Sequence, residues 1–296
     1  MKNKYVFTAV LLLVIFLSGA GLTWIYIQGQ TNDRTEDKFT VITSFYPMYI
    51  AAQNIIGDCK NVELSNLSEP TTGCMHDYQL TTQDMKKLSV ADAFIVNGGG
   101  IENFLTDVAN QYPELTMINA CENISLLDEN AHAWMSIPRY MAQVREITDG
   151  LVKADRKHSK EYQANCDGYL GKLERLNRQK EAVAAKLKGK NIVIFHEAFA
   201  YIAKDFGLHI SASLDLDEER QVSAGEVKNI VNQINSHQVA MVLAEKQYGQ
   251  EMSEAVRGET GVKVVYLSTC VRGDYRADSY LEAMQDNLEL LESAVE

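Results

Sequence analysis

Short apolar runs and amphipathic segments alternate along the first half of the chain. Runs rich in β-branched and aromatic residues predict strands at 40–45, 62–67, 93–97 and 115–119. The segments between them, such as 48–56 and 83–88, have the spacing of helices. Strands that alternate with helices form a parallel sheet covered on both faces. We therefore expect residues 39–157 to form an α/β lobe.

One long amphipathic helix is predicted next, in a stretch without any strand signal. Steps of three and four residues between apolar positions place these positions on one face of the helix. They are Tyr162, Cys166, Tyr169, Leu173, Leu176, Val183 and Leu187. Gly189 supplies the stop, so residues 158–189 are expected to form a rigid connecting helix.

Alternation resumes after Gly189, with strands predicted at 191–195, 209–213, 240–244 and 263–267 and a final helix at 279–294. The predicted fold class is α/β with two lobes, 39–157 and 190–296. Each lobe should hold a mainly parallel four-stranded sheet flanked by helices, and the long helix joins them. Open sheets bind ligands beyond the carboxyl ends of their strands, so the cleft between the lobes is the expected site.

An N-terminal transmembrane helix is expected to precede the lobes. Lys2 and Lys4 stand before an uncharged stretch at 5–30, which is about as long as a membrane-spanning helix. Basic residues before it and acidic residues after it place the remainder outside the cytoplasm. We predict an anchor at 1–30 and a linker at 31–38, on the extracytoplasmic face of the cell membrane. A cleaved signal peptide, with a secreted or periplasmic product, is the alternative, because small residues follow the apolar core at 18–21.

The charge of the chain argues against nucleic acid as a partner. The whole sequence carries a formal net charge of −12, and leaving out Lys2 and Lys4 gives 26 basic and 40 acidic residues, or −14, for the exported part. Such a surface repels phosphate backbones and attracts cations.

Five cysteines without a CxxC pair leave the redox state open. They are Cys59, Cys74, Cys121, Cys166 and Cys270. A disulfide is compatible with a location outside the cytoplasm, but the odd number leaves at least one thiol without an intrachain partner.

Three of the six histidines share a position at or soon after the end of a predicted strand. They are His76, His132 and His196, whereas His158, His209 and His237 stand on a helix start, a strand start and a polar loop. Neutral imidazole is a preferred zinc ligand, and three imidazoles from separate loops can occupy three corners of a tetrahedron. These three residues are therefore the candidate metal ligands.

Several segments, in order along the chain, resemble the zinc- and manganese-binding solute-binding proteins of bacterial ABC transporters. They are GCMHDYQLTTQDMKKL (73–88), ADAFIVNG (91–98), AHAW (131–134), FHEAFAY (195–201), FGL (206–208) and SYLEAM (279–284) with Asn287. The resemblance implies two α/β lobes bridged by one long helix, with a divalent metal ion held in the cleft. It also implies a monomeric receptor without enzymatic activity, whose partners are an ABC permease and its ATPase.

Carried over position by position, the resemblance places metal ligands at His76, His132 and His196. Manganese-selective members tend to carry glutamate at the third position, where this chain has His196. Imidazole-rich sites suit zinc and oxygen-rich sites suit manganese. Zinc is therefore the expected cargo, with manganese as the alternative.

The fourth ligand position departs from the family pattern. The family usually places an aspartate just after the last strand, where this chain has Ser268. Cys270 as a thiolate, Asp274 or a water molecule could complete the shell, and we take Cys270 as the candidate ligand. Cys270 could instead form a disulfide with Cys74 or be an inert thiol.

Two other functions use the same histidines. A zinc hydrolase would need a general base, for which Glu197 beside His196 is the candidate. A surface adhesin would hold metal for structure alone, and family members have often been described as adhesins. The collinear resemblance favours capture and release of the metal.

Overall fold

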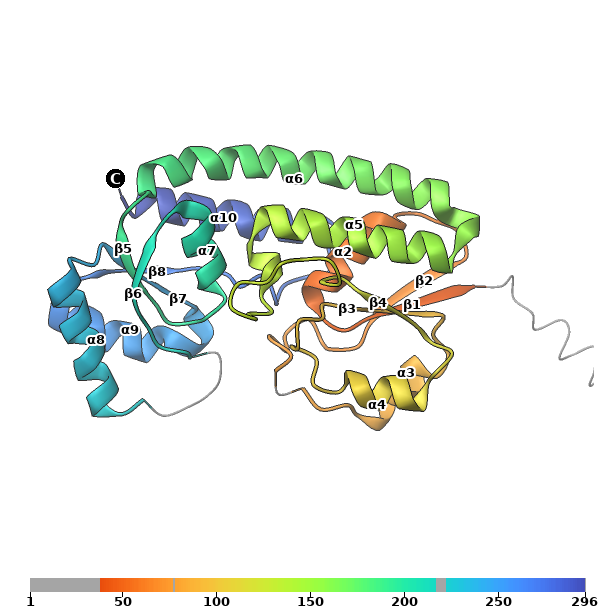
Figure 1. The fold of residues 1–296 in the computed structure, drawn as a ribbon, viewed down its shortest axis with the longest axis horizontal. Coiled ribbons are helices and arrows are strands. Elements are labelled where there is room, and N and C mark those ends of the chain that lie inside the picture. Colours follow the sequence, from red (N-terminus) through yellow and green to blue (C-terminus); the bar gives the residue numbers. More distant parts are fainter. Residues whose placement is uncertain (1–37, 77, 217–221, 296) are drawn as a thin grey trace, which may run out of the picture. The chain divides into compact units, whose positions relative to one another are not determined.

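The computed structural model describes residues 38–76, 78–216 and 222–295, shown as a ribbon in Figure 1. The predicted anchor at 1–30 and the linker as far as residue 37 lie outside them. Among the described residues, none of the helices combines the length and the apolar character that a membrane span needs.

The first sheet has the strand order β2-β1-β3-β4. Its strands are β1 (Phe39–Thr43), β2 (Val62–Asn66), β3 (Ala93–Val96) and β4 (Thr116–Asn119). β3 runs parallel to both β1 and β4, with Ala93 opposite Val41 on one side and Thr116 on the other. All four side chains of β3 are buried, as expected for a central strand with both faces covered.

Helices lie on both sides of the first sheet in Figure 1. They are α2 (Tyr46–Ile56) and α5 (Ile137–Ala154) on one side, and α3 (Thr82–Leu88) and α4 (Leu105–Gln111) on the other. We call this sheet with its four helices the first lobe.

The second sheet repeats the arrangement with the order β6-β5-β7-β8. Its strands are β5 (Asn191–Ile194), β6 (His209–Ser213), β7 (Met241–Ala244) and β8 (Lys263–Tyr266), and β5 and β7 run parallel to each neighbour. Its helices are α7 (Phe199–Phe206), α8 (Ala224–His237), α9 (Lys246–Thr260) and α10 (Ser279–Ser293). Val193, Val242, Ile230 and Val256 belong to the buried core between strands and helices. We call this part the second lobe.

A single helix, α6 (Ser159–Leu187), is 29 residues long, or about 43 Å at the usual rise per residue. It packs against α2 and α5 of the first lobe and against α7 and α10 of the second. Figure 1 shows it running along the top of both. The apolar positions of the sequence pattern form its buried face.

The segment after β8 belongs to the second lobe in sequence but contacts the first. Gln53 Nε2 of α2 donates a hydrogen bond to the Tyr275 carbonyl over 2.8 Å, and the Tyr275 ring lies 4.3 Å from the ring of Tyr49, centroid to centroid. Trp134 Nε1 donates to the Thr269 carbonyl over 2.8 Å. The two lobes are thus held together at several points besides α6.

The eight predicted strands are confirmed, and so are the two parallel four-stranded sheets and the long helix. The helix predicted at 48–56 begins two residues earlier, at Tyr46. Pro47 lies in its first turn, where a missing N–H costs no helical hydrogen bond.

Candidate metal centre

His132 stands in the loop that leads from β4 to α5, directly before the short 3-10 turn Ala133–Met135. Its backbone N–H and its Nδ1 both lie 2.9 Å from Asn130 Oδ1, and Nδ1 is 3.2 Å from Glu197 Oε1. Because both neighbours of Nδ1 are acceptors, Nδ1 carries the ring hydrogen. The lone pair of the neutral ring is therefore on Nε2, on the side of Cys74.

A buried polar network holds the loop that carries His132. Asn97 Nδ2 donates to the carbonyl of Ala131 over 2.9 Å, and Gln143 Nε2 of α5 donates to Asn97 Oδ1 over 2.8 Å. Glu102 accepts from the backbone N–H of Asn97 over 2.7 Å. These hydrogen bonds tie the His132 loop to the residues after β3, so the end of β3 helps to define the position of His132.

His196 stands two residues after the end of β5, behind Phe195, and its side chain is fully buried. Burial, together with the neighbouring His132, His76 and Arg272, lowers the pKa of His196 to about 2. The ring is therefore neutral at physiological pH, which is the form that binds metal. Its Nε2 lies 3.9 Å from Cys74 Sγ and 3.8 Å from Glu245 Oε2.

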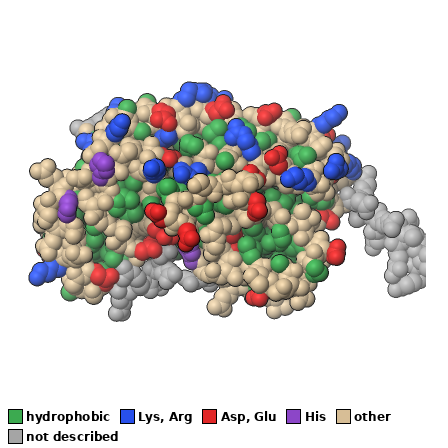
Figure 2. All heavy atoms as spheres, viewed as in Figure 1, with side chains coloured by type: hydrophobic (Ala, Val, Ile, Leu, Met, Phe, Trp, Pro, Cys, Tyr) green, Lys and Arg blue, Asp and Glu red, His purple; other side chains and the backbone are tan. Residues whose placement is uncertain are grey.

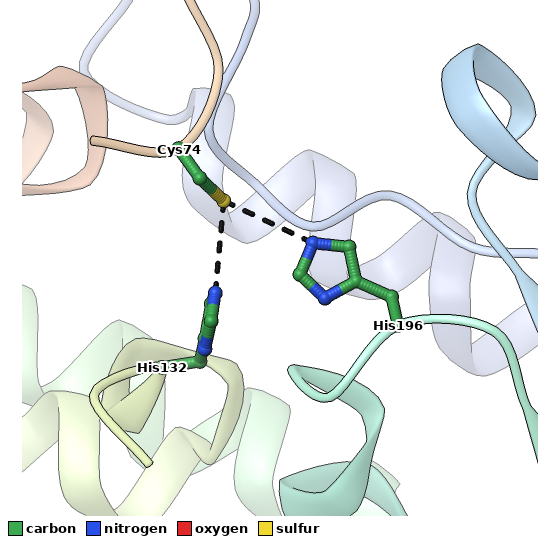
Figure 3. Close-up of side chains that lie close together, drawn as sticks. All are labelled: Cys74, His132 and His196. Carbon is green, nitrogen blue, oxygen red and sulfur yellow. Dashed lines mark hydrogen bonds between the residues drawn. The ribbon is translucent and has the colours of Figure 1, made fainter. Parts of the chain in front are cut away.

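Cys74 lies in the loop between β2 and α3. A capping box of Thr81 and Asp84 starts α3 and so ends this loop. Cys74 Sγ is 3.7 Å from His132 Nε2, and the ligand atoms of Cys74, His132 and His196 all lie within 4.8 Å of one another. Figure 3 shows the three side chains turned toward one another.

The spacing of these atoms fits a tetrahedral zinc ion. Zinc bonds of about 2.3 Å to sulfur and about 2.0 Å to nitrogen at a tetrahedral angle put the two ligand atoms about 3.5 Å apart. The two sulfur–nitrogen distances, 3.7 and 3.9 Å, exceed this value by a few tenths of an ångström.

His76 lies beside this group rather than in it. Its side chain is 29% exposed, and its Nε2 is 3.8 Å from Glu197 Oε1. His76, His132 and Glu197 form a second group of atoms within 4.8 Å of one another. The two groups share His132, whose ring centroid is 5.2 Å from that of His76.

Glu197 is held on the outer side of His132. The hydrogen bond from His132 lowers the pKa of Glu197, so this carboxyl group is ionised at neutral pH. A carboxylate that accepts a hydrogen bond from Nδ1–H of a histidine fixes the tautomer in which Nε2 can bind a metal.

Cys270 belongs to neither group that the described residues form. Its thiol is 1% exposed and lies 4.0 Å from the Ser268 carbonyl, and burial raises its pKa to about 12. Asp274 accepts a hydrogen bond from Ser279 Oγ and pairs with Arg276, and it too is outside both groups. The fourth ligand therefore stays a prediction, and the geometry brings Cys74 to the histidines instead of Cys270.

None of the five cysteines, all of which lie in the described ranges, is in a disulfide. The bond considered between Cys74 and Cys270 is thus not present in this structure.

Cys74 was not among the metal ligands predicted from the sequence, and no role was predicted for Arg272. Cys74 is two positions before His76 on the same loop, so its place in the sequence was a usable signal. Arg272 donates to Glu245 Oε1 over 2.9 Å, a contact between residues 27 positions apart that the sequence does not reveal.

Figure 2 shows lysine and arginine side chains mostly in the upper half of this face, with acidic side chains between them and below them.

Comparison with known proteins gives the family. The model of the zinc-uptake complex component A, periplasmic (ZnuA), matches residues 41–294. The high-affinity zinc uptake system protein ZnuA of Bacillus subtilis is 25% identical and covers 89% of each chain. The zinc-binding protein AdcA of Streptococcus pyogenes is 25% identical over 98% of this chain, which spans 61% of that relative's length.

Among solved structures, FpvC of Pseudomonas aeruginosa in complex with Ni²⁺ has a TM-score of 0.77 and 26% sequence identity. The match covers 87% of this chain and 97% of FpvC. Because the family model matches most of the chain, residues 41–294, the chain belongs to the ZnuA family of zinc-uptake components.

Proposed function

We propose that this chain is the extracytoplasmic receptor of an ABC importer that captures zinc as cargo with Cys74 Sγ, His132 Nε2 and His196 Nε2. The convergence of these three atoms from separate loops carries the proposal. The relatives include a zinc uptake system protein and a zinc-binding protein, which supports the choice of metal.

The donor set favours zinc over manganese on chemical grounds. A thiolate and two imidazoles are soft to borderline ligands, which bind zinc well, whereas manganese prefers carboxylate, carbonyl and water oxygens. His76, beside the group, is the candidate for the fourth corner, since its loop also carries Cys74. Cys270 would have to leave its buried position to compete.

Capture must rearrange His196 locally. Its Nδ1 accepts a hydrogen bond from the Ala198 N–H over 3.0 Å, so the neutral ring in this arrangement carries its hydrogen on Nε2. Coordination through Nε2 moves that hydrogen to Nδ1 and breaks the bond to Ala198. The thiol of Cys74 must also lose its proton, so zinc binding releases protons.

Delivery requires partners in the membrane. A permease and its ATPase would accept and transport the ion, and the stretch at 5–30, outside the described residues, would tether the receptor. The ionised Glu197 serves in this proposal to orient His132, not as the base of a hydrolase.

Metal titration of the purified chain tests the proposal. We expect one tightly bound zinc per chain and weaker binding of manganese. Cys74→Ser should lower zinc affinity about tenfold to a hundredfold, because it replaces a thiolate by a poor ligand. Cys270→Ser is the matched control and should leave the affinity unchanged.

Three other outcomes would each contradict one part of the proposal. Loss of affinity in Cys270→Ser with none in Cys74→Ser would restore the original fourth-ligand prediction. A preference for manganese would contradict the choice of cargo, and absence of metal binding would contradict the receptor function.

A further inference from the structure

Arg272, in the segment after β8, contacts both lobes at the metal centre. We propose that Arg272 holds the loop at 71–74, which we call the Cys74 loop, against the part of the second lobe that carries His196. We call these contacts the latch, and we propose that they set the rate at which zinc leaves. This inference rests on the proposed function, because it concerns the same site.

On the second lobe, Arg272 pairs with the carboxylate next to His196. Its Nη1 lies 2.9 Å from Glu245 Oε1, and Glu245 is 4% exposed. Glu245 Oε2 is 3.8 Å from His196 Nε2. A buried carboxylate needs a partner of opposite charge, so Arg272 stabilises Glu245 beside the metal ligand.

A second contact ties Arg272 to α9. Its Nη2 donates a hydrogen bond to the hydroxyl of Tyr248, and its guanidinium carbon lies 5.1 Å from the centroid of the Tyr248 ring. The planar guanidinium is thus fixed in position and direction on the second lobe.

On the first lobe, the same guanidinium rests on the loop that carries Cys74. Its Nε donates to the Thr71 carbonyl over 3.1 Å. Gly73 has a φ of +93°, and a Cβ at this position would collide with the Arg272 guanidinium. The absence of a side chain at Gly73 therefore allows Arg272 to lie directly against the backbone next to Cys74.

These contacts set the separation between the two sides of the site. Nε, Nη1 and Nη2 of Arg272 each make a directed contact, one to the Cys74 loop and two to the second lobe. The lobes have other connections, including those of Tyr275 and Trp134. Loss of Arg272 should therefore release the loop at 71–74 while the lobes stay together.

The test is the dissociation rate of zinc from the full chain, measured by stopped-flow mixing of the zinc-loaded protein with a chelator. Arg272→Ala should raise this rate about tenfold to a hundredfold, the range expected for losing hydrogen bonds to a charged group. Arg272→Lys keeps the charge but not the three directions of donation. Its zinc dissociation rate should therefore lie between those of the unaltered chain and Arg272→Ala.

Arg276→Ala is the matched control. Arg276 is an exposed arginine on the same segment that pairs with Asp274 and Glu282 and lies outside the site. Its removal should change the rate less than about twofold, as expected for exposed ion pairs. Thermal unfolding of each variant separates a released loop from a destabilised fold.

An unchanged dissociation rate in a folded Arg272→Ala variant would overturn the latch. If that variant does not fold, Tyr248→Phe removes one acceptor alone and should raise the rate a few-fold; no change there overturns the latch as well. Failure of the unaltered chain to bind zinc would instead overturn the proposed function, which the titration detects before any variant is compared.

Discussion

Two side-chain clusters in this protein contain histidine but differ in their other residues and in their architecture. At the junction of α5 and α6, His158 Nδ1 lies 2.5 Å from Asp155 Oδ2, and Tyr162 OH donates to the same oxygen over 2.7 Å. All three residues are within one short stretch of chain. At the metal centre, Cys74, His132 and His196 come from loops far apart in sequence.

The difference separates structural histidines from candidate ligands. The junction cluster matches donors with acceptors and so joins two helices. The metal-centre cluster instead brings together nitrogen and sulfur atoms whose shared property is that they bind metals. Long sequence separation adds a folding cost that metal binding can offset.

The largest effect is expected from removing one histidine of each cluster in turn. His132→Ala should lower zinc affinity more than about a hundredfold, because it removes a ligand shared by both groups at the metal centre. His158→Ala should leave zinc affinity unchanged and lower the free energy of unfolding by about 1–2 kcal/mol. Competitive zinc titration and urea denaturation measure the two quantities, and equal zinc affinities in both variants would erase the distinction.

A smaller effect is expected at Glu197, the carboxylate beside His76 and His132. Glu197→Ala removes the carboxylate that accepts from His132 Nδ1, and loss of such a partner lowers metal affinity about tenfold. Isothermal titration with zinc measures the change. Should the affinity rise instead, Glu197 would be holding His76 or His132 away from the metal.

The smallest effect is expected in the junction cluster and depends on pH. Burial raises the pKa of Asp155, but hydrogen bonds from His158 and Tyr162 outweigh it, so the pKa is lowered below 3.8. The ionised form therefore stabilises the fold at pH values above 3.8, and this contribution is lost as pH falls through the lower folded pKa.

Asp155→Asn should consequently cost about 1 kcal/mol at pH 7 and much less at the acid end. Denaturation curves between pH 3 and pH 7 measure the difference. A constant difference across this range would show that the charge of Asp155 does not matter.

The sequence pattern predicts the fold well because the elements repeat. Parallel strands with both faces covered, such as β3, read as continuous apolar runs, and α6 shows its helical spacing over its whole length. His132 and His196 were predictable as candidates because they follow strand ends, where loops of one sheet edge converge.

The rest of the site depends on the path of the backbone and the orientation of side chains, which the sequence pattern does not show. Cys74 and His76 occupy one loop, and its backbone path decides which side chain meets His196. Cys270 has a φ of +58°, and its backbone N–H donates to Ser268 Oγ over 3.1 Å. In this turn its thiol faces the Ser268 carbonyl. The bond from Arg272 to Thr71 spans 201 residues and arises from tertiary packing alone.

The shared helix α6 couples the stability of the two sheets. Its buried face covers α2 and α5 as well as α7 and α10, so neither lobe can unfold without exposing apolar surface on the helix that the other also uses. We expect the lobes to unfold as one cooperative unit. Zinc at a free concentration of a hundred times its dissociation constant adds about 2.7 kcal/mol to the free energy of unfolding of that unit. Backbone amides in both sheets, including strands that never touch the metal, should then exchange their hydrogens more slowly when the receptor carries its cargo.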